Sequence, residues 1–316
     1  MDVRRALLVG IDEYAFGPLT GCVADASAMR DLLERNADAS PNFDSELLSG
    51  PPVTVTRALL RERIERLFEQ PADVALFYFS GHGTVNNLGG YLVTQDASRY
   101  DEGVPMNDIL ALANQSPVRE VVVILDTCHS GALGQLPVIN NQAGLREGLS
   151  VLAASRAGES AVEAGGRGLF TTLVCDALDG GAADVLGNVT AAAVYGYVDQ
   201  ALGAWDQRPL LKSHVAKLTA LRQDRPAVPL SELRQLPTWF PEPRAAMKLD
   251  PSFEPTTVGH DPDKAAVFEV LQRCRAAKLV EPIGEAHMYY AAINSRACQL
   301  TALGRYYWHL ANEGRI

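Results

Sequence analysis

Short, continuous apolar segments alternate with amphipathic segments up to about residue 222. Segments such as 74–80 (VALFYFS) and 120–126 (EVVVILD) are almost entirely apolar, as is typical of strands buried on both faces of a sheet. The segments 22–36 and 57–70 place apolar residues at helical spacing. Buried strands separated by helices predict an α/β fold, in which helices cover both faces of a mainly parallel sheet.

Composition excludes several classes of protein. The 316 residues carry a net charge of -10, which argues against bulk attraction to nucleic acid or to an anionic membrane. No apolar run approaches the roughly 20 residues that span a bilayer, and the start of the chain lacks a signal-peptide pattern. We therefore expect a cytoplasmic protein. The five scattered cysteines include no CxxC pair and predict neither a disulfide framework nor a zinc ribbon.

Seven of the 18 prolines lie between residues 226 and 255. This cluster predicts a large domain over 1–222, a Pro-rich linker over 223–255 and a small domain over 256–316. In the small domain, helices are predicted to start after Asp261 and at Thr301, and the segment 287–294 (HMYYAAIN) is predicted as a strand. This order resembles the end of a winged-helix domain.

Two predicted apolar strands are each followed by a residue whose side chain can take part in catalysis. One runs into FSGHG and the other into LDTCHSG, so His82 and Cys128 are expected at the carboxyl edge of one sheet. A histidine can deprotonate a cysteine for nucleophilic attack, and the amides of Gly83 and Cys128 could hold the resulting oxyanion. Taken singly, a buried cysteine can be a small core residue, and SGHG can be a turn. His129 is nearer in sequence, but adjacent strand residues point to opposite faces.

The motifs FYFSGHG and LDTCHSG resemble the histidine and cysteine motifs of caspase-like cysteine peptidases, in particular the metacaspases and their bacterial relatives. The likeness extends over about residues 5–220. It implies a caspase-like α/β/α sandwich with His82 as general base and Cys128 as nucleophile of a cysteine endopeptidase. By the same resemblance, the enzyme would serve regulated proteolysis in a bacterial stress or defence pathway.

The resemblance also implies the substrate. The residues that match the metacaspase specificity pocket are Cys22, Asp25, Ser80 and Asp126. Two carboxylates there would hold a guanidinium, which predicts cleavage after Arg and also Lys. The alternative is structural, because Asp25 suits the first turn of a helix and Asp126 can accept backbone amides.

No cofactor or metal is expected. Many metacaspases bind calcium at an acidic loop after the histidine motif, whereas the segment 84–98 contains Asp96 as its sole acid. Calcium prefers six or more oxygen ligands, usually with several carboxylates among them. The sequence also lacks GxGxxG and GxxxxGK[ST] nucleotide-binding motifs.

Two further functions compete with the peptidase. One is an interaction protein on a caspase-like scaffold whose C-terminal domain binds another protein. The other is a DNA-binding regulator, but from residue 231 onward 10 Lys and Arg balance 10 Asp and Glu. Phosphate binding normally needs a basic face, so the expected partners are protein substrates with Arg or Lys at the cleaved position.

The loop between Cys128 and the next core strand contains one basic residue, Arg146. We expect this loop to be exposed, and exposed loops are preferred sites of proteolysis. In the caspase family, activating cleavage commonly occurs in this region, which predicts cleavage after Arg146 by another copy or by an upstream protease. An ordinary solvent-facing arginine is the alternative.

Overall fold

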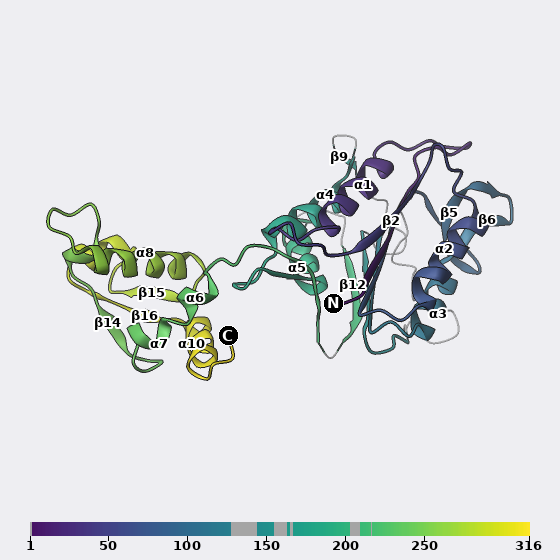
Figure 1. Cartoon of the computed structure of the whole chain (residues 1–316). Coiled ribbons are helices and arrows are strands. Elements are labelled where there is room, and N and C mark those ends of the chain that lie inside the picture. The colour runs from purple at the N-terminus through teal and green to yellow at the C-terminus, as the bar shows by residue number, and fades with distance from the viewer. Residues whose placement is uncertain (1, 128–143, 155–162, 165–166, 203–208, 216) are drawn as a thin grey trace. The chain divides into compact units, whose positions relative to one another are not determined.

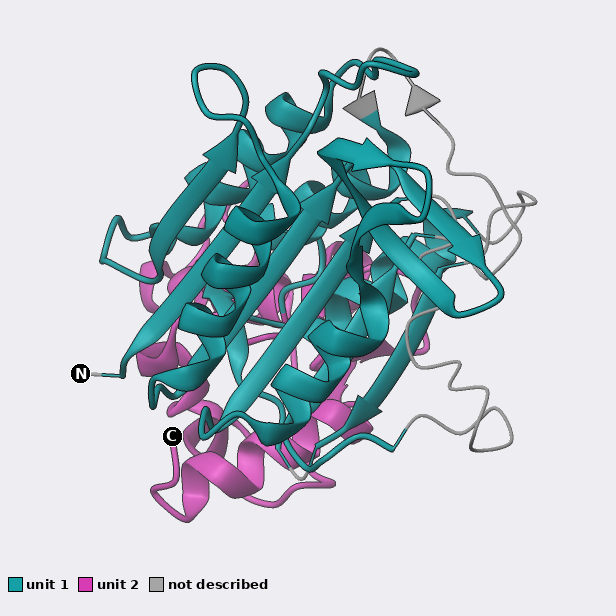
Figure 2. Ribbon diagram, turned by 90° about the vertical axis from the view of Figure 1, so that its right-hand side faces the viewer, with its two compact units in different colours: residues 1–183, 188–224 teal, residues 184–187, 225–316 magenta. Residues whose placement is uncertain are grey.

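The structure is a computed structural model that describes residues 2–127, 144–154, 163–164, 167–202, 209–215 and 217–316 (Figure 1). It forms two compact units (Figure 2). The first comprises Met1–Ala183 and Asn188–Asp224, and the second comprises Asp184–Gly187 and Arg225–Ile316. Each unit has a hydrophobic core of its own.

A six-stranded sheet forms the centre of the first unit, with the strand order β12-β8-β7-β3-β1-β2. The strands are β1 (Arg4–Gly10), β2 (Asp44–Ser49), β3 (Val74–Ser80), β7 (Glu120–Asp126), β8 (Leu149–Ala153) and β12 (Leu210–His214). All neighbours pair in parallel except β12, which is antiparallel to β8. Every residue of β3, β7 and β8 is buried, which explains their nearly continuous apolar sequences.

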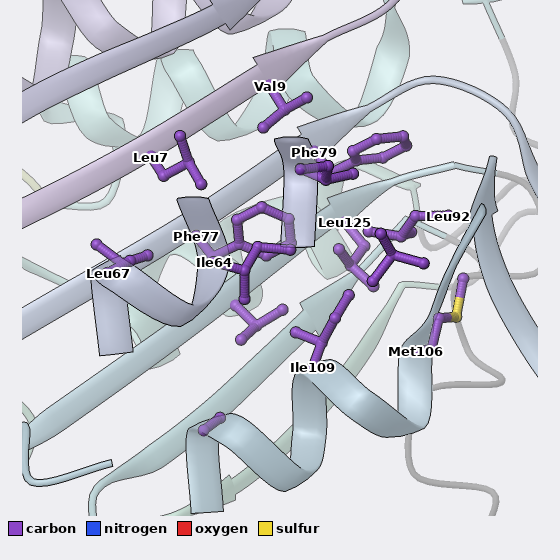
Figure 3. Close-up of a cluster of buried hydrophobic side chains, with 14 of the residues drawn as sticks. Leu7, Val9, Ile64, Leu67, Phe77, Phe79, Leu92, Met106, Ile109 and Leu125 are labelled. Atoms are coloured by element: carbon purple, nitrogen blue, oxygen red, sulfur yellow. The ribbon is translucent and has the colours of Figure 1, made fainter. Parts of the chain in front are cut away.

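Helices cover both faces of this sheet (Figure 1). The helices α1 (Cys22–Leu33), α4 (Leu169–Asp176) and α5 (Ala191–Leu202) lie on one face, and α2 (Arg57–Glu69) and α3 (Met106–Gln115) lie on the other. Alternate strand residues divide between the two cores: Phe77 and Leu125 pack toward α2 and α3 (Figure 3), while Tyr78 and Ile124 pack toward α1 and α4. The predicted α/β/α sandwich with a mainly parallel sheet is confirmed.

Smaller elements complete the first unit. A three-stranded antiparallel sheet follows directly on His82 and consists of β4 (Gly83–Asn86), β5 (Gly89–Ser98) and β6 (Asp101–Pro105). The remaining elements are β9 (Glu163–Ala164) paired with β10 (Arg167–Gly168), the π-helix η2 (Ala177–Gly181), and β11 (Asn188–Thr190) paired with β13 (Ala220–Gln223).

The second unit is built around the antiparallel sheet β14-β16-β15. Its elements are α6 (Leu230–Leu233), α7 (Leu236–Trp239), β14 (Ala246–Lys248), η3 (Pro251–Phe253), α8 (Pro262–Ala276), β15 (Val280–Ile283), α9 (Met288–Ile293), β16 (Ala297–Leu300) and α10 (Ala302–Asn312). Asp261 caps α8 and Thr301 caps α10, so both predicted helix starts are confirmed. The winged-helix likeness of this unit stays a prediction.

Two predictions for this part of the chain differ from the structure. Residues 223–255 were expected to be a linker, but from Arg225 onward they belong to the second unit, because apolar side chains between the prolines are buried in its core. These side chains are Val228, Leu233, Leu236, Phe240, Leu249 and Phe253. The strand predicted at 287–294 is wrong: the segment forms α9, whose buried residues Met288, Ala291 and Ala292 follow helical spacing.

Candidate active site

The histidine motif follows β3 and packs the His82 ring against two aromatic side chains. The ring centroid lies 4.7 Å from that of Tyr14 and 5.7 Å from that of Phe16. His82 Nε2 lies 2.6 Å from the carbonyl oxygen of Gly17. Because a carbonyl can only accept, Nε2 is the protonated nitrogen, and Nδ1 of this tautomer carries the lone pair that a general base needs.

Tyr14 fixes the backbone at this histidine. Its buried hydroxyl accepts a hydrogen bond from the His82 amide at 3.1 Å and donates one to the Val93 carbonyl at 3.2 Å. Burial raises the pKa of Tyr14, so the phenol stays neutral and can donate. Gly81 is required next to it, since a Cβ at that position would lie 2.5 Å from the Tyr14 hydroxyl oxygen.

Two buried carboxylates approach one glycine on the α1 and α4 face of the sheet. Asp25 is 1% exposed and its Oδ2 accepts from the Gly168 amide at 2.9 Å. Asp126 is 6% exposed and its Oδ2 accepts from the Thr171 amide at 3.2 Å and the Thr171 hydroxyl at 2.6 Å. A Cβ at Gly168 would lie 2.3 Å from Asp126 Oδ2 and 3.1 Å from Asp25 Oδ2. The acidic cluster, as we call Asp25 and Asp126, therefore needs glycine at 168.

Cys22 and Ser80 border the acidic cluster. Burial raises the pKa of the Cys22 thiol to about 12, a hydrogen bond with Ser80 opposes the rise, and the negative charges of Asp12, Asp126 and Asp25 add to it. Cys22 is thus a neutral thiol near pH 7 and no competing nucleophile. Cys22 therefore interacts with the other three predicted pocket residues, which are Asp25, Ser80 and Asp126. The structure brings the whole predicted set together.

The ends of β3 and β7 are neighbours, as the position of the predicted nucleophile requires. Ser80 is the register partner of Asp126, and the Gly81 amide donates to the Asp126 carbonyl at 3.4 Å. Cys128 itself, and with it half of the predicted oxyanion site, falls outside the described residues, which stop at Thr127 before resuming at Gly144. Gly83, the other half, is the first residue of β4.

The sequence profile of the caspase domain, a peptidase family, matches residues 3–219. The chain belongs to the caspase domain family. Metacaspase-1A of Aspergillus fumigatus is 29% identical over an alignment of 163 residues that covers 45% of this chain and 38% of that protein. Metacaspase-1A of Aspergillus niger is 30% identical over an alignment of 160 residues that covers 45% of this chain and 39% of that protein. This caspase domain protein thus matches about two fifths of the length of these relatives.

Solved structures show the same fold at low identity. Caspase-1 from Spodoptera frugiperda superposes with a TM-score of 0.51 at 12% identity, covering 71% of this chain and 91% of that one. Protein GSU0716 from Geobacter sulfurreducens gives 0.51 at 16% identity, covering 71% and 98%. The central sheet with its helices is therefore the caspase-like fold.

Arg146 differs from the exposed arginine that the loop predicts. Its Nε donates to the Ala113 carbonyl at 2.9 Å, Nη2 to the Val118 carbonyl at 2.6 Å and Nη1 to the Glu147 carbonyl at 2.7 Å. Its amide donates to Asn114 Oδ1 at 2.8 Å, and partial burial lowers the pKa of the guanidinium. In this caspase domain Arg146 holds the chain against the end of α3, and a protease would first have to break these contacts to cleave after it.

Other observations concern metals and membranes. Among the described residues, no group of three or more His, Cys, Asp or Glu side chains is arranged to hold a metal ion. None of the helices in the described part of the chain is both long and apolar enough to cross a bilayer.

The sequence interpretation missed several residues of the site. Tyr14, Phe16 and Gly17 lie in the loop DEYAFGP between β1 and α1, and two aromatic residues in a loop were the available signal. Gly168 and Thr171 surround the acidic cluster from the start of α4, and nothing local in their sequence indicates this role.

Proposed function

We propose that this caspase domain is a cysteine endopeptidase that cleaves after Arg, and also Lys, with His82 as base and Cys128 as nucleophile. The observation that carries the proposal is the fixed His82 imidazole, whose Nε2 is held at the Gly17 carbonyl at the carboxyl end of β3. The neighbouring strand β7 leads directly to Cys128. A role in a bacterial stress or defence pathway is a prediction from the resemblance alone.

The reaction uses Nδ1 of His82, while Nε2 stays hydrogen-bonded to the Gly17 carbonyl. Nδ1 takes the proton of the Cys128 thiol, and the sulfur attacks the carbonyl carbon of the substrate. The amides of Gly83 and Cys128 stabilise the oxyanion. The imidazolium then gives its proton to the leaving amine as the C–N bond breaks. Water, deprotonated by His82, hydrolyses the thioester and releases the acid and the thiol.

The acidic cluster supports the choice of a basic substrate residue. Two carboxylates in a buried site repel one another, and a guanidinium between them relieves the repulsion with charge-assisted hydrogen bonds. Asp25 and Asp126 converge on Gly168, whose missing side chain lets the two carboxylates lie close together. An aspartate side chain would add a third negative charge, so we expect it to be rejected.

Cleavage of a peptide library by the purified protein, beside the Cys128→Ala variant, tests the proposal. We expect nearly all Cys128-dependent cuts to follow Arg, with a smaller share after Lys. Lysine has one point charge where arginine has a planar fork that matches carboxylates, so its share should be lower. Cuts mainly after Asp, or cuts that persist in Cys128→Ala, would contradict the proposal.

Tyr14 is expected to act as a positioning residue for His82. Tyr14→Phe keeps the ring packing but leaves the His82 amide without its acceptor, a loss of about 1–3 kcal/mol. We expect kcat to fall about tenfold while KM changes less than about twofold, since the hydroxyl is buried and bonded within the protein. The matched control is Tyr100→Phe, at an 81% exposed tyrosine, which should change neither constant. A rise in KM alone would assign Tyr14 to substrate binding.

A further inference from the structure

A pocket of about 480 Å³ lies directly beside His82. Phe16, Val93 and Ala97 form its apolar wall, and Arg99 and Glu102 are its charged residues. The volume is within the range of about 300–1,000 Å³ that is usual for ligand sites. Phe16 is 61% exposed, so a large aromatic face stands open to solvent next to the predicted base.

The pocket and the acidic cluster belong to opposite faces of the central sheet. Val93 packs in the core under α2 and α3. Asp126 bonds to Thr171 of α4, and Tyr78, which also contacts Thr171, packs in the core under α1 and α4. His82 stands between the two regions, at the end of the strand that separates them.

We infer that this pocket holds the side chain of the residue that follows the cleaved bond. The inference rests on the proposed peptidase function. If the basic side chain on the acyl side enters the acidic cluster, the nitrogen that His82 protonates lies beside the imidazole. The leaving chain then continues away from the cluster, along the wall to which His82 itself and Phe16 contribute.

The lining determines which residue fits. Arg99 and Glu102 carry opposite charges, so the pocket has no net attraction for either sign. Binding of an apolar side chain against this apolar wall is favourable, because the side chain is removed from water. Such a pocket discriminates by about tenfold or more in kcat/KM between side chains that differ by a few carbon atoms. The pocket therefore selects leucine or phenylalanine over small or charged residues at the position after the cut.

The test uses peptides that are identical up to the cleaved Arg and differ only in the next residue, which is Leu, Phe, Gly or Glu. In the unmodified protein, kcat/KM is expected to be about tenfold higher for Leu and Phe than for Glu. Phe16→Ala removes the apolar wall and Ala97→Leu fills the pocket. Both variants should bring the Leu-to-Glu ratio close to one, and each ratio is measured within one variant, so changes in overall activity cancel.

Leu88→Ala is the matched control, because Leu88 is 75% exposed in the turn between β4 and β5 and does not line the pocket. It should leave the ratio as it is. A ratio at or below one in the unmodified protein, or a ratio that survives both pocket variants, overturns the inference. Arg-aminocoumarin has no residue after the cleaved bond, so it distinguishes failure of this inference from failure of the proposed function. Hydrolysis of Arg-aminocoumarin without a Leu-to-Glu preference among the peptides rejects the pocket. No hydrolysis of any Arg substrate rejects the peptidase function.

Discussion

Cys128→Ala and His82→Ala are each expected to lower kcat/KM for an Arg peptide by about four orders of magnitude or more. The first removes the nucleophile and the second removes the base that activates it, and residues that act as such a unit are each nearly indispensable. The measurement is hydrolysis of an Arg-aminocoumarin peptide, with circular dichroism to verify folding.

Controls make this result specific. His260→Ala, at an exposed histidine of the second unit, should retain full activity. A cysteine-directed electrophile should label Cys128 and spare Cys22, because the Cys22 pKa of about 12 keeps that thiol protonated. Full activity of Cys128→Ala, or labelling confined to other cysteines, would remove Cys128 from the mechanism.

Asp126→Asn is expected to reduce kcat/KM for Arg peptides by about 100-fold, mainly through KM. Loss of one partner from a buried charge pair costs about 3–5 kcal/mol, and the remaining carboxylate of Asp25 limits the effect to the low end. The amide still offers an oxygen to the Thr171 amide and hydroxyl, so the substitution removes charge and retains an acceptor. Asp25→Asn should act in the same direction.

Citrulline makes the test sharper, since it replaces the guanidinium of the substrate with a neutral group of the same shape. The unmodified protein should prefer Arg over citrulline by about 100-fold, and Asp126→Asn should shrink that preference, as a double-mutant cycle requires. Asp31→Asn, on the exposed side of the same helix α1, is the matched control and should have no effect. An Arg preference that is unchanged in Asp126→Asn would place the specificity pocket elsewhere.

The sequence predicted those parts of the site that are carried by regular elements. β3 and β7 were evident from their apolar runs, and because parallel strands end at one edge, the neighbouring positions of Ser80 and Asp126 followed. Asp25 lies in the helix that the apolar periodicity of 22–36 predicted, and its assignment to the pocket came from the resemblance to the metacaspases. These are short-range patterns whose consequence in three dimensions is fixed by the fold.

The parts that escaped prediction depend on contacts between distant segments. Tyr14 reaches the His82 amide from a loop, and Gly168 meets Asp25 from the position just before α4. The prolines of 226–255 indicated a linker because composition reports local stiffness, whereas burial of Leu236 and Leu249 depends on the rest of the second unit. For Arg146, polarity indicated exposure, but its donors are satisfied by carbonyl groups at the end of α3.

The start of α4 has a consequence for turnover. The amides of Gly168 and Thr171, at the positive end of this helix, already bind the carboxylates of the acidic cluster before any substrate arrives. A guanidinium that enters must share these oxygens with the helix, so its net gain is smaller than that of a cation meeting bare carboxylates. We therefore expect the cleaved fragment, which ends in Arg, to dissociate readily, and product inhibition by short Arg-ended peptides to be weak.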